Sequence, residues 1–271
     1  MSEHISLAVI DRIKDRVHAL VTESRTRLKG CQYIDVRIEV SESKGAYAQN
    51  GTAKESQEDA EISMGVRVHA GESMLAPGHY GRVLGSTDVQ NLEGIVSEGI
   101  EHAYRRAWAN AARKMDAERA LGPLSNALAS TTLAPIQIYQ DTVMSPVRIH
   151  PATRALSDIL GEALSISQAV KSYDARVLYN SVGIGSMMVR ELFASSEGAL
   201  IDQLYPLTQG FVYVVAREPG SAPEAHYDWV GDLKGWEVLE GENVHGKTFR
   251  QFAQDLTHDT VELAGAEMLD P

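Results

Sequence analysis

Few of the residues that could do chemistry in this 271-residue chain form a pattern that a known reaction requires. Glu98 and His102 are four residues apart in a predicted helix, so they share a face and have the spacing of a two-ligand metal site. A solvated Glu–His pair on a helix surface is far commoner, and we prefer that interpretation. The sequence contains no His-Glu-x-x-His, no His-Glu-x-x-x-His and no Cys-x-x-Cys. We therefore predict no catalytic residue, no metal ligand and no cofactor-binding residue in this chain.

The remaining reactive or motif-like residues also favour structural roles. His69 and His79 flank a glycine-rich segment and could line a site after folding, although exposed loop histidines are commoner. Cys31 precedes a predicted strand and is expected to be a buried small hydrophobe rather than a reactive thiol. Gly183-x-Gly185 lacks the third glycine of a dinucleotide-binding loop, so we interpret it as strand or turn glycine. The three tryptophans are expected to be packing anchors: Trp108, Trp229 and Trp236.

Two stretches of the chain are weak copies of one another, residues 7–68 and residues 153–216. Each contains a helical segment followed by strands, and a repeated helix–strand–strand–strand unit builds an extended sheet. The predicted fold class is α+β, with two units of helix plus antiparallel or mixed sheet, a long connecting helix and a closing helix. The expected domains are residues 1–145 and residues 146–271.

Periodicity and turn residues place the elements of the first unit. A helix is predicted over residues 5–28, with Gly30 as its stop. The strand over 33–40 alternates apolar and polar residues, which indicates a sheet with one wet face. Asn50-Gly51 is a strong hairpin signal. Residues 71–85 are predicted to be a loop or an irregular hairpin.

The elements that follow are two predicted helices, a proline-punctuated connection and the second unit. Thr87-Asp88 is expected to cap a long helix over 89–116, and residues 118–130 are a candidate for a shorter one. In the second unit the turn is predicted at 195–198. Residues 217–246 are loop-rich, and the closing helix covers about 247–267.

Composition and charge exclude some classes of partner. The net charge is −12, from 25 Lys and Arg against 37 Asp and Glu, which argues against a nucleic-acid partner. The apolar runs are too short for a membrane span, and the N-terminus does not resemble a signal peptide. A single cysteine, Cys31, cannot form an internal disulfide, so we expect a cytoplasmic protein.

Taken in order, these landmarks resemble the N-terminal half of the TldD/PmbA family of metallopeptidase-like proteins. The resemblance extends over nearly the whole chain, and it depends on the order of the motifs because no single motif is specific. The motifs are the strand 33–40, the turn Asn50-Gly51, the strand end 65–68, the long helix after Asp88, the strand at 175–179, the turn at 196–201 and the closing helix running into 266–269.

The resemblance implies a catalytic half outside this sequence. In the family that half carries a His-Glu-x-x-x-His zinc motif and a further cysteine ligand, and none of these residues can be placed here. Zinc is therefore expected on a partner half, in a hetero-oligomer that encloses a channel for peptide-like substrates. The candidates for lining that channel are Arg67, His69, His79 and Tyr80. Residues 71–86 look longer than the family's usual glycine-aromatic hairpin.

The function that this resemblance implies is a non-catalytic half of a zinc metallopeptidase. It would form the substrate channel and the partner interface for a separately encoded catalytic half, and its substrates would include maturing peptides or peptide-like natural products. The alternatives are a stand-alone binding or assembly subunit and a truncated fragment. A neighbouring reading frame with the zinc motif would favour the first of these three.

Overall fold

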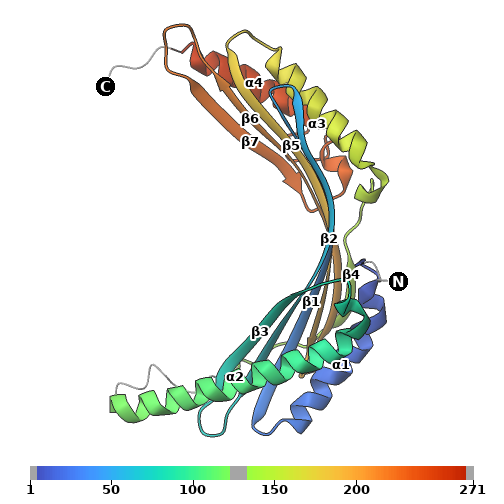
Figure 1. Ribbon diagram of the computed structural model, residues 1–271, viewed down its shortest axis with the longest axis vertical. Helices are drawn as coiled ribbons and strands as arrows, with labels where there is room; N and C mark the ends of the chain where they lie inside the picture. The colour runs from blue at the N-terminus through green and yellow to red at the C-terminus, as the bar shows by residue number, and fades with distance from the viewer. Residues whose placement is uncertain (1–4, 123–132, 267–271) are drawn as a thin grey trace. The chain divides into compact units, whose positions relative to one another are not determined.

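The computed structural model describes residues 5–122 and 133–266, and it is an α+β fold, as the sequence predicts. Seven strands form one sheet in the order β3-β2-β1-β5-β6-β4, with β7 also paired to β6 (Figure 1). The strands are β1 (Cys31–Gln49), β2 (Thr52–Ala70), β3 (Ala76–Leu84), β4 (Gln140–Met144), β5 (Val177–Ser195), β6 (Leu200–Ala216) and β7 (Glu224–Asp232). The helices are α1 (Val9–Arg27), α2 (Leu92–Leu121), α3 (Leu156–Lys171) and α4 (Phe249–Ala264), with short 3-10 turns at Asp88–Asn91, Pro151–Thr153 and Trp236–Val238.

The predicted repeat is present in the order of the elements. One copy is α1-β1-β2-β3 followed by α2, and the other is α3-β5-β6-β7 followed by α4. The neighbouring strands β1 and β5 are antiparallel, because Asn50 N–H donates to Asn180 O at 3.0 Å while Ser196 N–H donates to Ile34 O at 2.8 Å. β4 pairs in parallel with β6, so the sheet is mixed.

The chain folds into two compact units that interleave along the sequence. Unit 1 contains residues 1–41, 60–144 and 189–204, and unit 2 contains 42–59, 145–188 and 205–271. One change of unit, between 144 and 145, lies next to the domain boundary expected from the prolines. The other changes lie within the long strands, because the tip of the β1–β2 hairpin belongs to unit 2 and the tip of the β5–β6 hairpin to unit 1.

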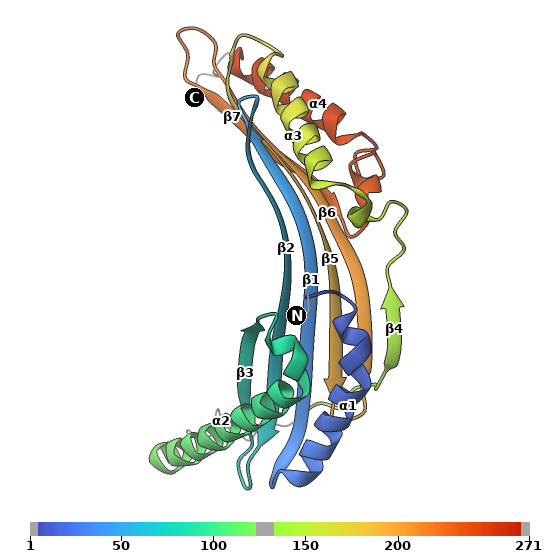
Figure 2. The same ribbon diagram turned by 45° about the vertical axis from the view of Figure 1, so that its right-hand side comes forward.

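In unit 1, α1 and α2 lie on the same face of the sheet (Figures 1 and 2). The alternation of β1 explains this, since Ile34, Val36 and Ile38 are fully buried on the helix side. Val66 and Val68 of β2 add to the same core. The other face of the sheet carries polar side chains and has no helix over it in Figure 1.

Of the two structures predicted for residues 71–85, a loop or an irregular hairpin, the structure shows a hairpin, and its second strand is regular. Residues 76–84 form the regular strand β3, which pairs with β2 from Ala70↔Ala76 to Ile62↔Leu84. Its glycines do not break the strand. Glycine is required at position 78 because the backbone of α2 packs directly against it. A Cβ there would lie 2.1 Å from Ala103 O and 2.3 Å from Ala107 N.

The predicted cap of the long helix was wrong in detail. Thr87 makes no capping hydrogen bond, and α2 begins at Leu92 after a 3-10 turn. Asp88 instead accepts from Gly85 N–H at 2.9 Å and pairs with Arg82 at 3.0 Å. Most of the shorter helix predicted over 118–130 lies outside the described residues.

In unit 2, α3 and α4 lie on one face of the sheet (Figure 1). α4 starts with a capping box in which the Thr248 hydroxyl accepts from Gln251 N–H and the Gln251 side chain accepts from Thr248 N–H. Phe249 is fully buried, and its ring lies where a Cβ on Gly210 would be, which explains a glycine in mid-strand. The loop-rich prediction for 217–246 missed β7. In the two described ranges, no helix is long and apolar enough to cross a membrane.

Candidate functional site

A polar cluster lies on the open face of unit 1, where β1 and β2 bring Asp35 and Arg67 together. The two side chains form an ion pair, with Arg67 Nη2 2.6 Å and Nε 2.7 Å from Asp35 Oδ2. The Arg67 guanidinium also lies 5.6 Å from the ring centroid of Tyr33. Burial, and then the Asp35 carboxylate, raise the pKa of Tyr33 to about 12, so this phenol stays protonated at neutral pH.

His69 lies beside this cluster and is only 5% exposed. Its ring meets Tyr33 edge-on, with centroids 5.9 Å apart. Burial, and then the positive charge of Arg67, lower the pKa of His69 below its ordinary value of 6.5. Its Nδ1 atom is buried and has no hydrogen-bond partner among the residues that the structure describes.

The four residues predicted to line a channel are not all together. His79 lies directly opposite Arg67 in the β2–β3 ladder, so it shares the open face with Arg67 and His69. Tyr80 is on the helix side, where it stacks on His102 of α2 with ring centroids 5.1 Å apart. The channel role of all four stays a prediction, but the structure separates Tyr80 from the other three.

The other residues considered for chemistry lie in structural positions. Glu98 and His102 form a helix-surface pair at 3.4 Å. Across 5–122 and 133–266, no group of three or more His, Cys, Asp and Glu is placed to hold a metal. Cys31 is buried, as predicted, and burial raises the pKa of its thiol to about 11. Trp236 is the expected packing anchor at 2% exposure, whereas Trp229 is 52% exposed.

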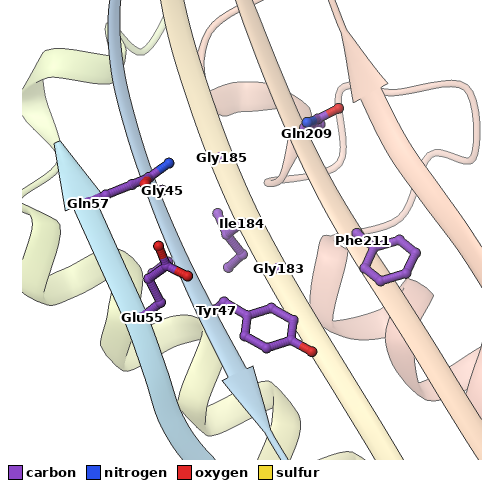
Figure 3. A pocket seen from close by; sticks show the side chains of 10 residues that line it. Gly45, Tyr47, Glu55, Gln57, Gly183, Ile184, Gly185, Gln209 and Phe211 are labelled. Carbon is purple, nitrogen blue, oxygen red and sulfur yellow. The ribbon is translucent and has the colours of Figure 1, made fainter. Parts of the chain in front are cut away.

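A hollow of about 250 Å³ lies on the open face of the unit 2 sheet (Figure 3). The floor of the hollow is backbone, because glycine occupies three neighbouring positions of β1 and β5: Gly45, Gly183 and Gly185. Around that floor stand two aromatic rings, one carboxylate and two amides. The lining is Gly45, Ala46, Tyr47, Glu55, Gln57, Gly183, Ile184, Gly185, Gln209 and Phe211.

A ladder of aromatic rings extends from this hollow across β5, β6 and β7. Phe211 contacts Trp229 with centroids 5.3 Å apart, and Trp229 contacts Tyr227 at 5.3 Å. The ladder continues from Tyr227 to Tyr213 at 6.3 Å and from Tyr213 to Tyr179 at 5.7 Å. Sequence reasoning missed this surface. The signal was the i, i+2 spacing of aromatic residues in β6 and β7, of which β7 lies in the region that the sequence predicts to be loop-rich.

The sheet has an accessible edge next to the hollow. β3 covers β2 only from Ile62 to Ala70, so residues 52–58 of β2 extend beyond that pairing, and all seven are exposed. The outer edge of β3 itself is occupied by α2. Two side chains of α2 donate to carbonyls of β3, Arg106 to His79 O at 2.6 Å and Asn110 to Pro77 O at 2.8 Å. A third, Lys114, donates to Leu75 O just before the strand at 3.3 Å.

The fold and this surface define a class of protein: an α+β chain with two units, in each of which two helices pack on one face of the sheet. Residues 149–264, which contain α3 to α4, match the family model of the PmbA/TldA metallopeptidase central domain. Over these residues the match confirms the resemblance to the TldD/PmbA family seen in the sequence. No curated protein sequence matches the chain closely enough to count as a relative.

Three solved structures share the fold at low sequence identity. A candidate modulator of a DNA gyrase from Thermotoga maritima has a TM-score of 0.64 at 11% identity, over 96% of this chain and 50% of its own. A candidate modulator of DNA gyrase from Bacteroides thetaiotaomicron has a TM-score of 0.64 at 13% identity, over 96% of this chain and 52% of its own. TldE from Thermococcus kodakarensis has a TM-score of 0.53 at 12% identity, over 95% and 47%. The chain thus spans about half the length of these proteins.

Proposed function

We propose that this chain is the peptide-binding, non-catalytic part of a TldD/PmbA-type zinc metallopeptidase. Zinc and the general base would come from a partner polypeptide with a His-Glu-x-x-x-His motif. The support is the match of residues 149–264 to the family's central domain together with one observation, the exposed β2 edge at residues 52–58 beside a hollow in the open face. We expect the assembled pair in the cytoplasm.

The edge explains how such a chain would hold an extended peptide. A strand added to β2 gains main-chain hydrogen bonds from residues 52–58, and these bonds do not depend on the peptide's sequence. Alternate side chains of the peptide then meet the open face. Charged residues along the edge, which include Lys54, Glu55 and Glu58, discourage pairing between two copies of the protein.

Reconstitution with a candidate catalytic half tests the proposal. We expect a hetero-oligomer in light scattering, zinc that copurifies with the partner, and chelator-sensitive cleavage of unstructured peptides that needs both chains. A partner that cleaves equally well without this chain would overturn the proposal. Peptide binding without cleavage in the assembled pair would favour a stand-alone binding subunit instead.

Backbone methylation tests the mode of binding. Each N-methyl group on an edge-facing amide removes one hydrogen bond worth about 1 kcal/mol, which is about fivefold in affinity. Alternate amides of the bound peptide point toward β2, and the amides between them point away. A peptide methylated on the amides that point toward β2 should therefore bind much more weakly than the unmethylated peptide. The matched control is the peptide methylated only on the amides that point away from β2, which should keep its affinity. Equal affinities of the two methylated peptides would contradict strand addition.

A further inference from the structure

The hollow in unit 2 has an unusual combination of groups for an open sheet face. Two aromatic side chains, Tyr47 and Phe211, rise from β1 and β6 on either side of Gly183, as Figure 3 shows. Glu55 of β2 supplies the carboxylate at the rim, and Gln209 supplies an amide. The lining contains no Lys or Arg, so the only formal charge in it is negative.

Glu55 is available to a ligand. It is exposed and, among the residues that the structure describes, has no ion-pair or hydrogen-bond partner, unlike Glu58, which pairs with Lys44 at 3.2 Å. The nearest cation in sequence, Lys54, is the adjacent residue of the strand. Successive side chains of a strand point to opposite faces, so Lys54 does not neutralise the hollow.

We propose that this hollow is a subsite for a basic side chain, lysine or arginine, of the bound peptide. This inference rests on the proposed peptide-binding function and adds a substrate preference to it. Aromatic faces attract a cation, arginine guanidinium more often than lysine ammonium, and a carboxylate adds a charge-assisted hydrogen bond. The glycine floor lets a flat guanidinium lie against the backbone, where any Cβ would take up space.

A side chain reaches this hollow from a part of the peptide that lies over the open face, not from the residues paired with β2. Neighbouring strands lie about 4.8 Å apart, so a peptide strand paired with residues 52–58 lies about 10 Å from β1 and about 14 Å from β5. Its side chains meet Glu55 at the rim first, and a peptide that continues from the edge across the open face places another side chain between Tyr47 and Phe211. The net charge of −12 favours the approach of cationic peptides in general.

Binding to the whole 271-residue chain tests the subsite directly. The probes are two unstructured ten-residue peptides that are identical except for one arginine, replaced in the second by citrulline, which has the same shape without the charge. Titration calorimetry should show at least tenfold tighter binding of the arginine peptide at low salt. The Glu55→Gln variant should lose most of that preference. Tyr47→Leu should reduce it, with the citrulline peptide affected much less.

The matched control is Glu61→Gln, an exposed glutamate on the same strand but outside the hollow. This variant should keep the full preference for arginine. Equal binding of the two peptides to the unmodified chain would overturn the subsite while leaving the proposed peptide-binding function intact. Failure of both peptides to bind the chain and its reconstituted complex would overturn the subsite and the proposed function together. A neutral norleucine peptide that binds as tightly as arginine would show an apolar pocket instead.

Discussion

Arg190 of β5 and Asp202 of β6 form a two-point ion pair in unit 1, with Nε–Oδ1 at 2.8 Å and Nη2–Oδ2 at 2.7 Å. Their side chains are only 8% and 2% exposed. The same guanidinium bonds Asp11 of α1 at 2.6 and 3.0 Å and donates to Leu7 O at 3.2 Å. Arg190 thus connects α1 to the second copy of the repeat. Removing the buried counter-ion of such a charge destabilises the folded state strongly.

Removing one member of this pair should destabilise the protein strongly. Asp202→Asn leaves a buried guanidinium without its buried counter-ion, so we expect a loss of about 3–5 kcal/mol in the free energy of unfolding. Urea denaturation followed by circular dichroism measures it. Asp11→Asn is the matched control, because the Asp11 side chain is 58% exposed and its loss should cost much less. Equal losses of unfolding free energy in the two variants would show that the buried and the exposed carboxylate contribute alike, which contradicts the prediction.

Stability should decrease in acid because of these carboxylates. Hydrogen bonds from Arg190 hold the pKa of both Asp11 and Asp202 below the ordinary value of 3.8 in the folded state. Their stabilising contribution is therefore complete above the unfolded pKa and is lost as the pH falls through the folded pKa values. We expect the free energy of unfolding to begin falling below about pH 5.

The control for the acid effect is the double variant Arg190→Met/Asp202→Leu, which replaces the buried pair by apolar side chains and can keep the fold. Its unfolding free energy should depend less on pH between 5 and 2 than that of the unmodified chain. Equal slopes in pH-dependent urea titrations would show that the acid sensitivity comes from other carboxylates, such as Asp174, whose pKa Arg176 lowers to about 2.

Gly78→Ala should be destabilising although alanine fits a strand. The added methyl group would lie 2.1 Å from Ala103 O, and a helix backbone cannot move aside locally. We expect a loss of about 1–3 kcal/mol or more in the free energy of unfolding. Gly65→Ala is the control, since nothing lies within 4 Å of its added Cβ. Thermal or urea unfolding that ranks Gly65→Ala as the more damaging change would refute the packing of β3 against α2.

Cys31 should be inert in the folded protein. Its pKa of about 11 leaves about one thiol in a thousand ionised at pH 8, and the side chain is buried as well. The reaction with a disulfide reagent such as DTNB should be at least a hundredfold slower in buffer than in 8 M urea. Rapid labelling without denaturant, at a rate like that of free cysteine, would place Cys31 on an accessible surface.

Local sequence determined much of this fold. The alternation over Ile34, Val36 and Ile38 fixed which face of β1 is buried, because side chains of a strand alternate regardless of context. Asn50 and Gly51 have φ of 50° and 73°, the left-handed pair that this dipeptide favours in a hairpin. The repeat of helix and strands was also visible, since each copy carries its own periodicity.

Tertiary structure decided the rest, since the deciding contacts join residues far apart in the chain. The composition of residues 76–84 is typical of a loop or an irregular hairpin. Pairing with β2 makes them a regular strand, and α2 packs so closely on this strand that only glycine fits at position 78. The aromatic ladder and the hollow beside Glu55 exist only because β1, β2, β5, β6 and β7 lie next to one another. No periodicity within a single segment encodes that neighbourhood, because it depends on which strands pair.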